Sequence, residues 1–108
     1  MKLSKFFYNE SKWCQGEIAR KKDGTPIRNL NIVHRDGFEH DPSREAESFS
    51  LHGAVQFLYP GESQGEILFK LSEAVRKYTG QKLYTAQFND LASTTFEDIK
   101  SVLEISGL

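Results

Sequence analysis

The sequence predicts a small single domain, residues 1–108, of the mainly α to α+β class. We expect three or four helices around a buried central helix, with a short β-hairpin. Three observations predict this fold. The segment AESFSLHGAVQFLY, residues 46–59, is apolar around most of a helical circumference. Two later segments combine helix-start signals with apolar residues at helical spacing. A strong turn signal, Asp23-Gly24, separates two short stretches that read as strands.

The first 33 residues predict a short helix followed by the hairpin. Leu3, Phe6 and Phe7 have helical spacing, which favours two turns of helix over residues 2–9 as a cover for the core. Residues 13–18 alternate imperfectly, and with residues 25–33 they favour a hairpin closed at Asp23-Gly24. A helix across Glu17–Arg20 is also compatible with the sequence, so both alternatives stay open.

The central helix is expected to run from about residue 42 to 59. Residues 34–43 read as a loop, and Asp41 followed by Pro42 is a good helix start. Pro60-Gly61 ends the pattern. The Gly53-Ala54 step removes side-chain bulk, so another backbone or a ligand can approach the helix closely.

Two more helices follow. Ser63 and Glu66 have capping-box spacing before an apolar stripe, and Thr79-Gly80 supplies the end. Residues 81–88 are compatible with a strand or with a helical turn. Thr94 and Glu97 form a second capping-box pattern before the last helix, which stops at Gly107.

Composition limits the location and the partners. No apolar run approaches the roughly 18 to 20 residues of a membrane helix, and the first residues lack a signal-peptide core. Together with the single cysteine, Cys14, this predicts a cytoplasmic protein without a membrane contact. Net charge is −1, with eight basic against three acidic residues in 1–35 and one against seven in 36–66. The pI of about 6.3 argues against nucleic acid as a partner.

The residues that could carry catalysis or hold a metal form no complete motif. Cys14 is a candidate nucleophile, but no base is near it in the sequence, and a packed thiol is the simpler interpretation. His34 and His40 stand in a polar loop without the close Cys/His pairs of a zinc site. We therefore expect no catalytic pair, no metal and no cofactor.

A set of polar residues beside apolar anchors is the best candidate binding site. Gln15, Asn89 and Asp90, with His52 from the central helix, would form a small polar pocket beside Gly53-Ala54. In the ligand-binding interpretation they hold the polar head of a nucleotide-like molecule, while Arg20 and Lys22 meet its phosphate. In the structural interpretation these side chains bond to nearby backbone and tie loops to helix ends.

These residues resemble a family of short, functionally uncharacterised bacterial and phage-type proteins, classed as a domain of unknown function. The resemblance spans about residues 13–103 and rests on the order and spacing of four elements. They are Trp13-Cys14-Gln15-Gly16 before Asp23-Gly24, the Gly53-Ala54 helix, Phe88-Asn89-Asp90, and Thr95 at the final helix. Phe88 stands where a tryptophan is expected, and Leu51-His52 replaces a pair that usually contains a small residue or a cysteine. The resemblance implies a compact helical module with recurring polar positions at Gln15, Asn89 and Asp90, encoded in mobile or phage genomes.

We therefore expect a non-enzymatic binding protein that acts by protein–protein contact or sequestration, in the manner of a phage-encoded inhibitor. Its partner would be a protein or a small polar ligand, and a homodimer is one form of the contact. The alternatives are a nucleotide-like ligand-binding protein and a cysteine-dependent enzyme. The surplus of aromatic residues favours an exposed patch for a partner, although all could equally fill the core. The residues in question are Phe6, Phe7, Tyr8, Trp13, Phe38 and Tyr59.

Overall fold

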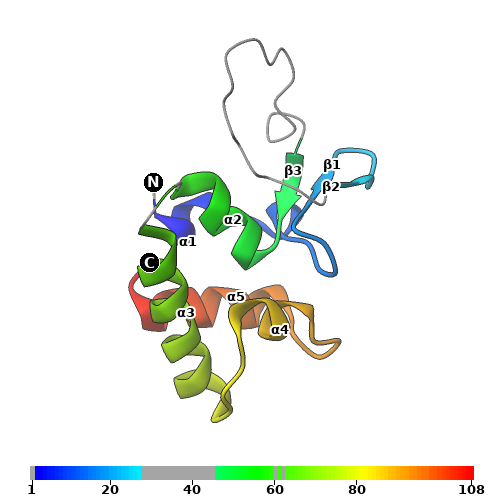
Figure 1. Cartoon of the computed structure of the whole chain (residues 1–108). Coiled ribbons are helices and arrows are strands. Elements are labelled where there is room, and N and C mark those ends of the chain that lie inside the picture. Colours follow the sequence, from blue (N-terminus) through cyan, green and yellow to red (C-terminus); the bar gives the residue numbers. More distant parts are fainter. Residues whose placement is uncertain (1, 28–45, 60, 62) are drawn as a thin grey trace.

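The computed structural model describes residues 2–27, 46–59, 61 and 63–108 (Figure 1). Five α-helices and a three-stranded antiparallel sheet occupy these ranges, which confirms the mainly α to α+β class. The helices are α1 (Leu3–Phe6), α2 (Leu51–Leu58), α3 (Ser63–Thr79), α4 (Thr85–Asp90) and α5 (Phe96–Ser106), with a 3-10 turn at Glu10–Lys12. The strands are β1 (Ala19–Lys21), β2 (Pro26–Ile27) and β3 (Ala46–Phe49).

The hairpin exists, but its first strand begins later than the sequence predicts. Strand β1 pairs with β2 across the turn at Asp23-Gly24, where Gly24 has a φ of +90°. Strand β3 pairs with the other edge of β1, so the order is β2-β1-β3. Residues 13–18 are not a strand, and the alternative helix over 17–20 is wrong because Ala19 and Arg20 pair in the sheet. Residues 28–33 of the expected second strand lie outside the described residues.

The central helix starts at Leu51 and not near residue 42, so this prediction is wrong in its first part. Residues 46–49 form β3 because β1 offers them a hydrogen-bonded neighbour, with Ala19 opposite Phe49. Ser50 then starts α2, since its hydroxyl accepts a hydrogen bond from Gly53 N at 3.0 Å. The expected loop 34–43, the start at Asp41-Pro42, and Pro60 lie outside the described residues.

The two long C-terminal helices follow the sequence closely. Helix α3 ends at Thr79, as expected, and Gly80 follows it with a φ of +75°. Ser63 is already part of this helix and does not precede it. The ambiguous residues 81–88 form no strand. Residues 81–84 are irregular, and α4 begins at Thr85.

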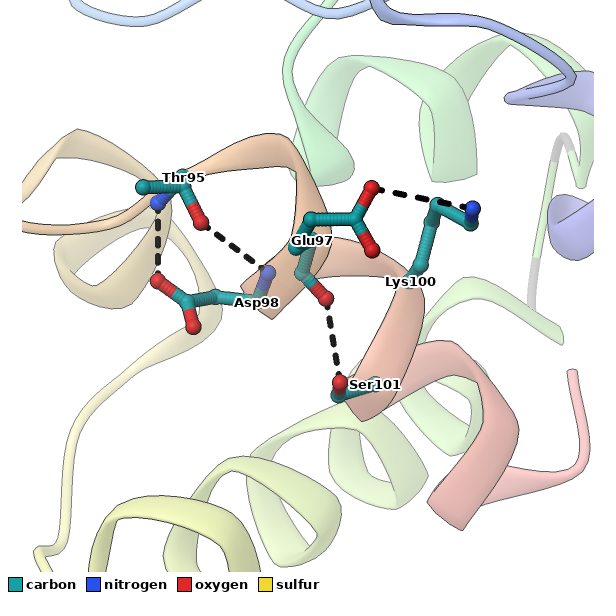
Figure 2. Close-up of polar contacts among 5 residues, drawn as sticks. All are labelled: Thr95, Glu97, Asp98, Lys100 and Ser101. Carbon is teal, nitrogen blue, oxygen red and sulfur yellow. Dashed lines mark hydrogen bonds and ion pairs between the residues drawn. The ribbon is translucent and has the colours of Figure 1, made fainter.

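The capping box of α5 lies one residue later than predicted. Thr95 Oγ1 accepts from Asp98 N at 3.3 Å, and Thr95 N donates to the Asp98 carboxylate at 2.8 Å (Figure 2). Glu97 instead pairs with Lys100 at 3.8 Å on the helix surface. Thr94 faces inward and donates to Phe88 O at 2.8 Å. The cap and the inward threonine together fix the entry of the chain into α5.

One apolar core joins the five α-helices and the three strands. Helix α3 packs on α5, and α2 packs on α3 and α4 (Figure 1). Fully buried side chains from three helices meet there: Val55, Leu71, Val75, Ile99 and Val102. Gly53 of α2 lies against the backbone of Ile18, so the close approach expected at Gly53-Ala54 is a chain backbone.

Candidate functional site

Residues 13–16, which we call the strap, lie between the sheet and α4. Trp13 forms an isolated parallel bridge with Phe49, and Cys14 N donates to Phe49 O at 3.0 Å. On the other side, the strap bonds to residues more than 70 positions later in the chain. The strap therefore joins the N-terminal part of the sequence to the C-terminal helices.

Asn89 of α4 is the centre of this contact. Its side chain is 0% exposed. The amide oxygen accepts from Trp13 Nε1 at 2.7 Å and from Leu51 N at 3.0 Å. The amide nitrogen donates to Cys14 O at 3.0 Å and to Asp90 Oδ1 at 2.9 Å. Two donors and two acceptor sites are all that this amide has, so its hydrogen-bonding capacity is fully used inside the protein.

Gln15 closes the C-terminal end of α4. Its amide nitrogen donates to Asn89 O and to Leu91 O, each at 2.9 Å, and lies 3.4 Å from Thr94 O. The last carbonyls of a helix have no partner within the helix, so the side chain supplies one. Gln15 and Asn89 thus come together as expected, in contacts that match the structural interpretation.

A shallow hollow of about 340 Å³ lies beside the strap. Two residues of the expected set line it: His52 from the first turn of α2 and Asp90 from the end of α4. Asp90 Oδ1 accepts from Gly16 N at 2.9 Å, which holds the carboxylate at the rim. The remaining lining comes from Gly16, Glu17, Ile18, Ser50 and Ala86. Gln15 and Asn89 do not line this hollow, so the expected set is divided between it and the strap.

The two cations expected to meet a phosphate have other positions. The Arg20 guanidinium donates to Gly24 O at 3.1 Å and to Gln15 O at 3.2 Å, which fastens the hairpin turn to the strap. Lys22 is exposed in that turn and does not line the hollow. With Glu17 and Asp90 at its rim, the hollow is better suited to a cationic group than to a phosphate.

Cys14 is a packed thiol. It is 8% exposed, and its Sγ lies 3.8 Å from Glu17 O. Burial raises the pKa of the thiol above its ordinary value, although a hydrogen bond with Ser48 and the charge of Arg20 act in the opposite direction. A raised pKa keeps the thiol protonated at neutral pH, and the protonated form is a poor nucleophile.

A groove of about 490 Å³ runs along α3 on the side of residues 82–84. Phe69 on α3 and Tyr84 before α4 line it and are 66% and 77% exposed. Leu68 and Leu83 also line it and are half-buried. Figure 1 shows the chain turning back after α3 and running beside that helix toward α4. Gly65, Ser72, Glu73, Arg76 and Lys82 complete the lining.

Two contacts lie beside the groove. The hydroxyls of Ser72 and Thr85 lie 3.4 Å apart, and Tyr84 N donates to Gln87 Oε1 at 2.9 Å. Outside the groove, the Tyr78 hydroxyl donates to Asp98 at 2.7 Å, which joins α3 to α5. The Ser72–Thr85 contact therefore holds α3 against the start of α4 beside the groove.

The exposed aromatic residues are mostly not those that the sequence pointed to. Of the expected group, Phe7 is buried, while Phe6, Trp13 and Tyr59 are half-buried. Tyr8 is 68% exposed and lines a separate hollow between α1 and α5. Phe38 lies outside the described residues, as do His34 and His40.

The described part of the chain holds neither a cluster of metal ligands nor a membrane-spanning helix. In residues 2–27, 46–59, 61 and 63–108, no three His, Cys, Asp or Glu side chains gather as a metal site would require. Within the same ranges, no helix has both the length and the apolar character to cross a bilayer. Comparison with family models, curated proteins and solved structures found no significant match.

The sequence analysis did not predict the groove, although one residue of the sequence indicates an exposed aromatic side chain there. Phe69 stands outside the apolar stripe of α3, on the polar side of an otherwise amphipathic helix. An aromatic residue at such a position has no place in the core. Tyr84 gave no comparable signal, because its exposure depends on where α4 begins.

Proposed function

We propose that this protein is a non-enzymatic binding protein that acts by contact with another protein chain through the groove beside α3. The observation that carries the proposal is the exposure of Phe69 and Tyr84 in a groove that the half-buried Leu68 and Leu83 also line. Exposed aromatic side chains next to aliphatic residues, with charged residues around them, are typical of protein-binding sites.

The contacts of the other candidate residues support this choice over a catalytic site. Asn89 and Gln15 use their amides on the strap and on helix ends, and Cys14 has a raised pKa. We also propose a cytoplasmic location, which the composition and the single cysteine predict, and a phage or mobile-element setting, which the resemblance implies. A reducing compartment suits a lone buried thiol.

Site-specific photo-crosslinking tests the proposal. A photoreactive phenylalanine analogue at position 84 is expected to give a protein-sized adduct in cells that produce the protein. Phe69→Asp should abolish the adduct, whereas Tyr8→Asp should not, because Tyr8 is equally exposed but lies away from the groove. An adduct that survives Phe69→Asp, or no adduct at position 84, would contradict the groove as the binding site.

The hollow beside the strap supports a second candidate, the binding of a small polar ligand. His52 and two carboxylates line it, which favours a ligand with a positively charged group over the nucleotide-like ligand expected from the sequence. Glu17→Gln should weaken binding of such a ligand, such as a small amine or guanidinium compound, because it removes one of the two carboxylates. Asp90 is unsuitable for this test, because it also holds Gly16 N. Titration calorimetry that finds no amine or guanidinium binding to the parent protein would exclude this candidate.

A further inference from the structure

We propose, on the basis of the proposed protein-binding function, that the partner in the groove is a second copy of this chain. In this homodimer the two α3 helices pack antiparallel across a two-fold axis. The charge pattern beside the groove, the exposed Phe69 and the small residue Ser72 support this contact.

Four of the five charged residues on α3 form one row along the helix, and the fifth, Arg76, lines the groove. Glu66, Lys70, Glu73 and Lys77 follow one another at spacings of four, three and four residues, so they share one side of the helix. This row borders the groove, since Glu73 is also part of its lining. The side chains of Glu66, Lys70 and Glu73 are 73%, 51% and 42% exposed. All are accessible to a partner.

The row is complementary to itself in one direction only. Read along the chain it is acid, base, acid, base, and the reverse reading is base, acid, base, acid. In an antiparallel pair Glu66 faces Lys77 of the second copy, and Lys70 faces its Glu73. In a parallel pair each charge would face its own kind. A two-fold axis also brings the same side of each helix together, so the two rows meet and the two grooves meet.

The apolar residues fit the same arrangement. Phe69 lies next to the row and near the middle of the paired segment, where it can pack against the second copy. Ser72 on the groove side is small, and in this register it lies close to the level that Phe69 of the second copy reaches. It therefore leaves room for that ring. The aromatic residues then supply the buried area, and the charges set the orientation.

The local ion pairs of the single chain do not remove this complementarity. Glu66 and Lys70 are 3.7 Å apart, and both are exposed. Arg76 donates to Glu73 at 2.8 Å and lowers the pKa of that carboxyl. Lys77 and Lys82 add positive charge near Glu73. Exposed pairs of this kind are weak, so they can rearrange when the second copy arrives.

Sedimentation equilibrium over a concentration series, with charge-reversal variants, tests the homodimer. The parent chain should show a monomer–dimer equilibrium. Phe69→Asp should raise its dissociation constant about tenfold or more, and the matched control Tyr8→Asp should not change it. Glu66→Lys and Lys77→Glu should each weaken the dimer, because each places like charges opposite one another twice. An equimolar mixture of these two variants should dimerise again, since both contacts are then between opposite charges. Circular dichroism should show that all four variants stay folded.

The outcomes separate this inference from the proposed function. A dimer that resists Phe69→Asp, or a mixture that does not dimerise, would overturn the antiparallel α3 contact. A chain that stays monomeric at every concentration would exclude the second copy. If position 84 still gives a Phe69-dependent adduct with a mass other than twice that of the chain, protein binding stands and the partner is a different protein. If neither dimer nor adduct forms, both proposals fall.

Discussion

A β-carbon placed on Gly53 would lie 2.1 Å from the carbonyl oxygen of Ile18. The same oxygen accepts a hydrogen bond from Ser50 N at 2.9 Å, which holds the start of α2 against the residue before β1. Neither the Ile18 oxygen nor the Ser50 nitrogen can move away without breaking their hydrogen bond. The position therefore requires glycine for space and not for backbone conformation.

Gly53→Ala is expected to destabilise the protein by roughly 2 kcal/mol or more, because steric overlap outweighs the better helix propensity of alanine. Chemical denaturation measures the free energy of unfolding. Gly65→Ala is the matched control, since it also lies within a helix but has open space around its β-carbon position. That variant should gain about 0.5 to 1 kcal/mol. Similar results for both glycines would contradict the contact with Ile18.

Asn89→Ala is expected to lower the free energy of unfolding by about 3 kcal/mol or more, because it leaves several buried partners without a hydrogen bond. Those partners are Trp13 Nε1, Leu51 N and Cys14 O. Thermal and urea denaturation measure the loss. Gln15→Ala should cost about 1 to 2 kcal/mol, since its contacts are partly exposed. An Asn89→Ala protein as stable as the parent would favour a ligand-binding role for this amide.

The link between Asp98 and Tyr78 should make α5 packing depend on pH at both ends of the scale. The hydrogen bond from the Thr95 backbone contributes most to lowering the pKa of Asp98, and the bond from Tyr78 lowers it further. This contribution is fully present above the ordinary aspartate pKa of about 3.9 and is lost as pH falls through the lowered value. The bond to Asp98 also raises the pKa of Tyr78. That contribution is fully present below a pH of about 10 and is lost as pH rises through the raised value.

An Asp98→Asn variant measures this dependence. It should be less stable than the parent at neutral pH, and the difference should shrink in strong acid, where the parent carboxyl is protonated too. Tyr78→Phe should reduce the difference at neutral pH, because it removes one of the two groups that bond to the carboxylate. A stability difference that is constant across the acid range would show that the carboxylate charge does not matter.

Cys14 is expected to react slowly with iodoacetamide in the folded protein, because its thiol is buried and its pKa is raised. Mass spectrometry follows the modified fraction with time. Denatured protein provides the control and should be modified rapidly. Fast modification of the folded chain would revive the cysteine-dependent enzyme as an alternative.

The sequence predicts the helices whose determinants are local. Helices α3 and α5 have apolar stripes and glycine ends that need no distant contact to be read. The sequence of residues 46–49 fits both a helix and a strand. These residues form a strand because they pair with β1, a contact distant in the sequence. The predicted position of the α5 capping box is wrong by one residue for a related reason. Thr94 and Thr95 have the same chemistry, and only the packed structure turns Thr94 toward Phe88 O.

For the candidate site, the sequence identifies the residues better than their partners. Gln15, Asn89 and Asp90 do lie together, but their bonds depend on where the strap meets α4. The position of His52 on another helix is equally non-local, which is why it meets Asp90 at the hollow and not the two amides. The groove depends on the path of residues 82–84, which no local pattern determines.

The bond between Trp13 and Asn89 has a kinetic consequence. It joins positions 76 apart, so the chain must close a long loop before the strap gains its partners. We expect the strap to form late in folding and to open only with the whole domain. Trp13 is the only tryptophan, and its indole nitrogen is part of this bond. Its fluorescence should therefore record the last step of folding without any added label.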